Sequence, residues 1–215
     1  MVIKKVTIFG ERCSGTNYLE ELLRVNFEVE IVWSHGWKHY FGFHDVTQNS
    51  DEILFIGIIR NLEDWVNSLY REKHALPWAV TKDVETFLTG EFFSVDEAQN
   101  EVMVDRNIET KERYKNIFEL RHVKNKYLVE TMPKLVKNYC LITYDDLVNH
   151  FDFIMGHIKN YNLEIKKDIS FPSNVKYYKM HKDVVYVKKP NQIPKEKILA
   201  KANMHYEKML FHEFL

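Results

Sequence analysis

The stretch that decides the fold is VTIFGERCSGTNYL, residues 6–19. An apolar run typical of a buried strand leads into two glycines five positions apart, and a helical pattern follows. Gly10 and Gly15 fit the phosphate-binding pattern G-x-x-x-x-G-K-[ST], but Thr16 replaces its lysine and Asn17 replaces its magnesium-binding hydroxyl residue. The stretch predicts an anion-binding loop without the groups that handle a γ-phosphate and Mg²⁺. A simple turn and helix cap is the alternative interpretation.

Strand-like and helical patterns alternate along the rest of the chain. The strand runs are continuous rather than alternating, which is typical of strands buried on both faces. This order predicts an α/β fold of three layers, with a mostly parallel central sheet, a P-loop-type strand-loop-helix and helices on both faces. The helix that begins at residue 117 is expected to have a charged face and to end near Pro133. The expected strands are residues 2–9, 29–33, 53–59 and 139–143, and the helical patterns cover residues 62–70, 117–132, 147–158 and 194–210.

The length of 215 residues predicts one domain that spans residues 1–215. Residues 74–107 show no strand of the sheet, and we expect them to form an insertion or lid on the acceptor side. In parallel sheets of this kind, ligands bind at the carboxyl ends of the strands. The residues that directly follow each strand are therefore the candidates for chemistry.

The charge and cysteine content of the chain limit which partners and metal sites we expect. The formal net charge is −1, which disfavours nucleic acid and anionic membranes as partners. No apolar run approaches the ~20 residues of a membrane span. The two cysteines match neither a disulfide framework nor a zinc site, so we expect no bound metal and a reducing, cytoplasmic compartment.

A second stretch, IIRNLEDWVNSLY at residues 58–70, supplies a candidate for another anion site. Arg60 stands at the end of the third strand run, and Ser68 follows two helical turns later. An arginine fork and a hydroxyl so placed can hold a phosphate. The alternative puts Ser68 with Asn61 and Asp64 on a solvated helix face.

Together, SGT after the first strand and Arg-x₇-Ser after the third resemble the sulfotransferases that use 3′-phosphoadenosine-5′-phosphosulfate (PAPS). Two further segments are similar to that family: LITYDDLV at residues 141–148 and NIFELRHVKNKYL at residues 116–128. The resemblance covers roughly residues 5–160. It implies that Arg60 and Ser68 bind the 3′-phosphate, and that the 5′-phosphosulfate is bound by the loop residues Arg12, Cys13, Ser14, Gly15, Thr16 and Asn17.

The resemblance also implies the reaction. A sulfuryl group would pass in line, without a metal ion, from PAPS to a hydroxyl of a carbohydrate or small-molecule acceptor, leaving adenosine 3′,5′-bisphosphate (PAP). The loop departs from the family where Cys13 replaces the usual Lys or Arg before Ser-Gly, with Arg12 one place earlier. Two alternatives stay open: a P-loop kinase or NTPase with a degenerate loop, and a non-catalytic nucleotide-binding protein of the same fold.

Candidate catalytic residues follow the second strand in WSHGWKHY, residues 33–40. The Lys38-His39 pair resembles the Lys/His region of the family. We expect His39 to be the general base, with His35 the next candidate and His44 the third. Lys38 or Arg12 is expected to stabilise charge on the transferring group. The alternative for each histidine is a surface or packing role.

The resemblance also implies a basic loop late in the chain that closes on the 3′-phosphate and adenine of the nucleotide. Lys188 and Lys189 are the candidates for it, with Lys182 another. A basic pair of this kind can also be simply solvated. Trp65 lies on the packing stripe of its helix and is expected in the core rather than against adenine.

Overall fold

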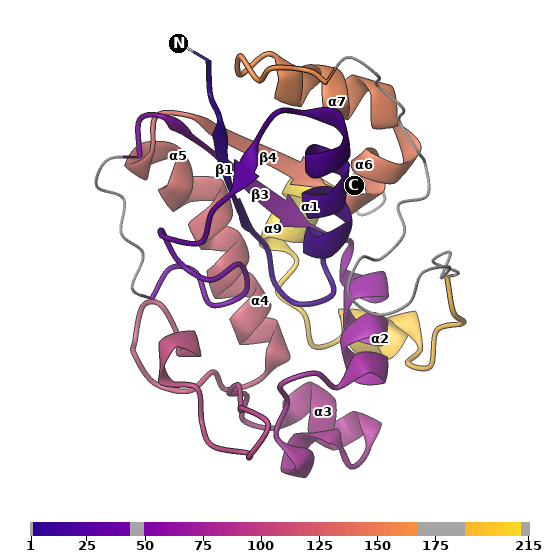
Figure 1. The fold of residues 1–215 in the computed structure, drawn as a ribbon. Coiled ribbons are helices and arrows are strands. Elements are labelled where there is room, and N and C mark those ends of the chain that lie inside the picture. Colours follow the sequence, from indigo (N-terminus) through magenta and orange to yellow (C-terminus); the bar gives the residue numbers. More distant parts are fainter. Residues whose placement is uncertain (1, 44–49, 167–187, 212–215) are drawn as a thin grey trace.

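The core of the protein is a four-stranded parallel sheet (Figure 1). The computed structural model describes residues 2–43, 50–166 and 188–211. The strand order is β2-β1-β3-β4, so β1 and β3 lie side by side at the centre and both end at the same edge. The predicted α/β class with a parallel sheet is confirmed. The strands are β1 (Lys5–Phe9), β2 (Glu30–Ile31), β3 (Ile53–Ile59) and β4 (Tyr139–Thr143).

Side chains of β3 alternate between two apolar clusters, one on each face of the sheet. Ile56 and Ile58 pack in the cluster that includes residues of α1 (Thr16–Asn26), α6 (Tyr144–Asn149) and α7 (Phe151–Lys159). Phe55 and Ile59 pack in the other, with residues of η3 (Tyr127–Thr131) and α5 (Met132–Leu135). Figure 1 shows these helix groups on opposite sides of the strands. The result is the three-layer arrangement expected from the sequence.

The helical run that begins at residue 117 ends at Leu135, close to Pro133 as expected. α4 (Ile117–Lys126) passes into the π-helical turn η3 and then into α5, whose first turn contains Pro133. Pro133 directly follows this π-helical turn, in which the N–H of Met132 bonds to the carbonyl oxygen of Tyr127. The expected charged face is also partly buried, since Arg121 and Lys124 are 5% and 2% exposed.

Other element boundaries also differ from the prediction: β2, for example, covers Glu30–Ile31 where residues 29–33 were expected. Residues 147–158 belong to two helices, α6 and α7, which meet at His150. Residues 194–210 form α8 (Lys195–Leu199) and α9 (His205–Leu210). The apolar period of this stretch places Met209 on the packed face, but Met209 is exposed. The first strand begins at Lys5. Apolar periodicity continues from α6 into α7 because both helices pack in the same cluster, so the pattern does not reveal that break. The apolar residues of α8 and α9 belong to different clusters.

Residues 74–107 add no strand to the sheet, as expected. They contain η1 (Trp78–Thr81), α3 (Val84–Thr89) and η2 (Met103–Asp105). Their apolar side chains share one core cluster with α2 (Leu62–Glu72), α4 and α8. The insertion is therefore packed onto the domain through a common core. Across all the described residues, no helix combines the length and the apolar character needed to cross a membrane.

Candidate functional site

The loop between β1 and α1 has the geometry of an anion cradle. Gly15 precedes the helix with φ +94°, and a Cβ there would lie 2.3 Å from the ring of Tyr144. At Gly10 a Cβ would lie 2.7 Å from the carbonyl oxygen of Ile58. Both positions therefore require glycine. Gly15 is the N-cap of α1 and makes no side-chain cap hydrogen bond. The dipole of a helix favours an anion at such an N-terminus.

Arg60 joins this loop to the first turns of α2. Its Nη1 donates to the carbonyl oxygen of Cys13 at 3.3 Å and to Ser68 Oγ at 3.1 Å. Arg60 and Ser68 are both buried, and the guanidinium lies 4.8 Å from the centre of the Tyr144 ring. The structure thus brings the two sequence motifs together at one point. Ser68 is not on a solvated face.

More charges surround this pair. Arg71 Nη2 donates to Ser68 Oγ at 3.3 Å. Asp64 Oδ2 lies 2.8 Å from Lys188 Nζ and 3.8 Å from Arg60 Nη2. Partial burial opposes ionisation of Asp64, but the hydrogen bond and charge of Lys188, with the charge of Arg60, lower its pKa. Three cations, Arg60, Arg71 and Lys188, thus lie around Ser68 and Asp64, and side chains of this kind can bind a phosphate.

The 188–193 segment lies along α2. Asn67, which is fully buried, accepts a hydrogen bond from the N–H of Ile193 at 2.8 Å and donates to its carbonyl oxygen at 3.3 Å. Arg71 Nη1 donates to the carbonyl oxygen of Pro190 at 3.2 Å. These bonds place the late basic stretch beside the Arg60–Ser68 pair.

Lys38 reaches the opposite end of the loop. The N–H of Gly10 donates to its carbonyl oxygen at 2.9 Å, which ties the loop after β2 to the loop after β1. Its Nζ donates to Asn17 Oδ1 and lies 3.4 Å from Glu20 Oε2. A lysine from another segment therefore stands beside the first turn of α1, where the loop's own lysine is missing.

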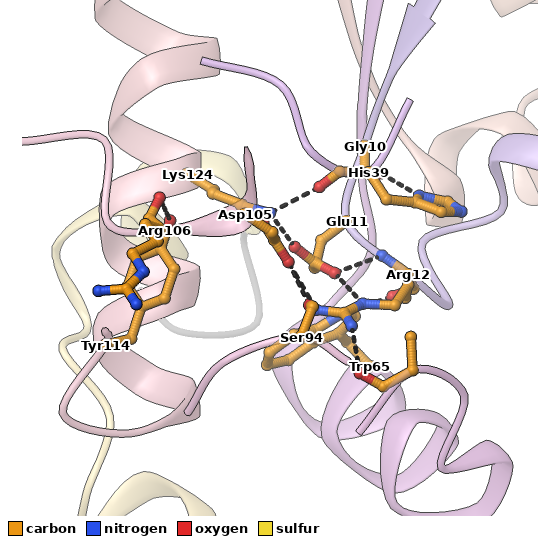
Figure 2. Close-up of polar contacts among 11 residues, drawn as sticks. Gly10, Glu11, Arg12, His39, Trp65, Ser94, Asp105, Arg106, Tyr114 and Lys124 are labelled. Carbon is orange, nitrogen blue, oxygen red and sulfur yellow. Dashed lines mark hydrogen bonds and ion pairs between the residues drawn. The ribbon is translucent and has the colours of Figure 1, made fainter. Parts of the chain in front are cut away.

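His39 is held against the same loop (Figure 2). Its Nδ1 lies 2.8 Å from the carbonyl oxygen of Gly10. A carbonyl oxygen only accepts, so Nδ1 carries the proton and Nε2 is the basic nitrogen. Burial, assisted by the charges of Arg12 and Lys38 and opposed by that of Glu11, lowers the pKa of His39 to about 3. The imidazole is therefore neutral at physiological pH.

Arg12 is turned toward the insertion. Its guanidinium, 2% exposed, donates to Glu11 Oε1 at 2.7 Å, to Asp105 Oδ2 at 3.3 Å and to the carbonyl oxygen of Ala75 at 3.3 Å. Its own carbonyl oxygen accepts from Trp65 Nε1 at 2.9 Å. Trp65 is buried in the core, as expected. The guanidinium of Arg12 thus bonds to Ala75 and Asp105 of the insertion and to Glu11 of its own loop. These bonds hold the loop against the insertion.

The remaining candidates are His35, Cys13, Lys189, His44 and Lys182. His35 is buried with its ring 5.3 Å from that of Phe55, a packing position in the core. Burial raises the pKa of the Cys13 thiol to about 12, against the lowering effect of Arg12, so the position of the family's usual cation holds an uncharged group. Lys189 is exposed. His44 and Lys182 lie outside the described residues.

Several residues of the site were not anticipated from the sequence. Asp145 accepts from the backbone N–H of Asn61 at 3.0 Å and from its Nδ2 at 2.6 Å, which links α6 to the residue after Arg60. Arg71 carries a detectable signal, because it lies three residues after Ser68 on one helix face. Asn67, Tyr144, Asp105 and Lys124 were also missed.

Neither a family model nor a curated protein matches the chain. Within the part of the chain that the structure describes, no group of three or more His, Cys, Asp or Glu side chains is arranged to hold a metal ion. The geometry of the loop and its neighbours is therefore the basis for a functional assignment.

Proposed function

We propose that this protein is a sulfotransferase that moves a sulfuryl group from PAPS to a hydroxyl of a carbohydrate or small-molecule acceptor. The supporting observation is the convergence of two cationic sites on one loop. Arg60 binds Cys13 and Ser68 at one end, and Lys38 binds Asn17 at the other. A nucleotide with anionic groups at both its 5′ and 3′ positions matches two such sites.

The residues have distinct roles in this proposal. The acceptor oxygen attacks sulfur, the bond between sulfur and the 5′-phosphate oxygen breaks, and PAP leaves. The proton of the acceptor hydroxyl passes to Nε2 of His39, which Gly10 keeps in the required tautomer. The ammonium of Lys38 and the N-terminus of α1 stabilise the negative charge that develops on the leaving oxygen.

Thermal melting with PAP and with ATP-Mg²⁺, each with and without EDTA, tests the assignment. A ligand at ~100 times its Kd adds ~2.7 kcal/mol, which raises the Tm by several degrees. We expect a shift with PAP that EDTA leaves unchanged and that Arg60→Ala abolishes. Arg113→Ala is the matched control and keeps the shift, because this surface arginine pairs with Glu91 and Glu101 of the insertion rather than with the loop. A shift with ATP-Mg²⁺ alone would favour the kinase or NTPase alternative.

A second candidate is a non-catalytic nucleotide-binding protein. It is favoured by the uncharged Cys13 and by the engagement of Arg12 with Glu11 and Asp105. PAPS turnover separates the two functions. If His39 is the base, His39→Ala lowers the rate ~10²–10⁴-fold while PAP still binds. Binding of PAP with no turnover by the unmodified protein on any acceptor would support the second candidate.

A further inference from the structure

Four charged side chains are buried together behind the phosphate loop (Figure 2). Glu11 and Asp105 supply the negative charges, and Arg12 and Lys124 the positive ones; the most exposed of the four, Glu11, is 7% accessible. Burying ion pairs costs about as much as their attraction returns, and apolar replacements are often equally stable. A gain in stability therefore does not explain why these charges are buried together. The contacts within the cluster indicate another role.

Lys124 is the centre of the cluster. Its Nζ lies 2.6 Å from Glu11 Oε2, 2.5 Å from Asp105 Oδ1 and 2.6 Å from the carbonyl oxygen of His39. An ammonium has three donors, so these contacts use its full capacity. Asp105 in turn accepts from Ser94 Oγ, another residue of the insertion. One ammonium thus links α4, the insertion and the loops that follow β1 and β2 (Figure 2).

These contacts fix His39 at two points. Lys124 holds its carbonyl oxygen, and the carbonyl oxygen of Gly10 holds its ring through Nδ1. Gly10 is joined in sequence to Glu11, which the same ammonium binds. Lys124 therefore positions the backbone of His39 directly, and it positions the ring indirectly through Glu11 and Gly10. Rotation of the ring away from Gly10 or displacement of its backbone breaks one of these bonds.

We propose that Lys124 and Asp105 are positioning residues that hold His39 in the Nδ1–H tautomer, with Nε2 as the proton acceptor. The catalytic meaning of this inference rests on the proposed function, in which His39 is the base. Asp105 orients Lys124, so the insertion takes part in setting up the base. Charged groups near the ring act as well: Glu11 favours protonation of His39, and Arg12 and Lys38 oppose it.

Nitrogen NMR of histidine side chains tests the positioning directly. The variant Lys124→Met/Asp105→Asn removes one charge of each sign, and Lys126→Met/Glu109→Gln makes the same change at an exposed ion pair of 2.6 Å that also involves α4. His39→Gln identifies the His39 signal. We expect a pure Nδ1–H form that stays neutral down to pH 5 in the unmodified protein and the control. In the first variant we expect mixed tautomers and protonation at a higher pH.

Kinetics provide a second readout that a purely structural role leaves unchanged. Positioning predicts that Lys124→Met/Asp105→Asn lowers PAPS turnover 10–100-fold while the Kd for PAP stays within about twofold. Unchanged His39 signals in the folded variant would overturn the inference. If that variant does not fold, Asp105→Asn alone makes the same test, with the same outcome counting against it. Failure of the unmodified protein to bind PAP would refute the proposed function, whereas the NMR result still decides the positioning role.

Discussion

At the scale of single residues, the neutral state of His39 makes stability depend on pH. Its pKa is lowered from an ordinary value near 6.5 to about 3, chiefly by burial. Between these values the unfolded chain binds a proton that the folded protein does not, so stability falls as the pH drops below 6.5. The slope approaches about 1.4 kcal/mol per pH unit for this group.

Urea unfolding at pH 7.5 and pH 4.5, with His39→Gln as the reference, measures this effect. Other titrating groups contribute equally to both proteins, so the difference isolates His39. We expect the unmodified protein to lose roughly 2–3 kcal/mol more of its unfolding free energy than the variant over this range. Equal losses in the two proteins would show that His39 titrates normally in the folded state.

Gly15→Ala tests the shape of the phosphate loop. The residue needs φ +94°, and the new methyl group would meet the Tyr144 ring at 2.3 Å. We expect a loss of about 1–3 kcal/mol in unfolding free energy and no measurable binding of PAP. Gly156→Ala in α7 is the control, because a Cβ there meets nothing within 4 Å. It should gain roughly 0.5–1 kcal/mol from helix propensity. Calorimetric melting and titration with PAP give both quantities.

At the scale of elements, α2 and the 188–193 segment act as a pair. Replacing Asn67 with Leu leaves the N–H of Ile193 without its partner inside the protein. We expect a loss of about 1–3 kcal/mol in stability, faster hydrogen exchange over residues 188–193 and weaker binding of PAP. Asn149→Leu, at the exposed end of α6, should change none of these. Exchange followed by mass spectrometry would contradict the pairing if residues 188–193 exchanged equally in both variants.

The strands could be predicted from the sequence more reliably than the helix ends. Residues 53–59 and 139–143 are strands with those bounds, because burial on both faces leaves an uninterrupted apolar run. Residues 147–158 divide at His150, where a local backbone change leaves the apolar period intact. The burial of Lys124 could not be predicted from the helical pattern, since its partners Glu11 and Asp105 come from distant segments that a local pattern does not include.

Some contacts of the candidate site could be predicted from the sequence and others could not. Arg60 and Ser68 could be paired from the sequence, because two helical turns separate a strand-end arginine from a hydroxyl on the same side. The burial of the Arg12 guanidinium could not, because it depends on Asp105, which the insertion brings back to the loop. Contacts within one strand-helix unit leave a spacing in the sequence. Contacts made by an irregular insertion do not.

At the scale of the whole molecule, the insertion and the sheet should unfold together. Residues 74–107 share an apolar cluster with α2, α4 and α8, and Asp105 is bonded to the phosphate loop through Arg12 and Lys124. We expect one cooperative transition in urea, with tryptophan fluorescence and far-ultraviolet circular dichroism giving the same midpoint. Trp65, which is buried, reports on α2. Earlier hydrogen exchange over residues 74–107 than over the sheet would identify the insertion as an independent unit.

The strand order also sets when the site can form during synthesis. β3 pairs with β1, which precedes it, but its other neighbour β4 comes about 80 residues later in the chain. Arg71 likewise bonds to Pro190, which lies near the end of the chain. The phosphate loop and Arg60 leave the ribosome well before these partners, so a nascent chain presents half of the cradle beside an unpaired strand edge. Such long-range pairing is slow and exposes the edge to other chains. A ligand that needs both halves of this site can therefore stabilise only the finished fold.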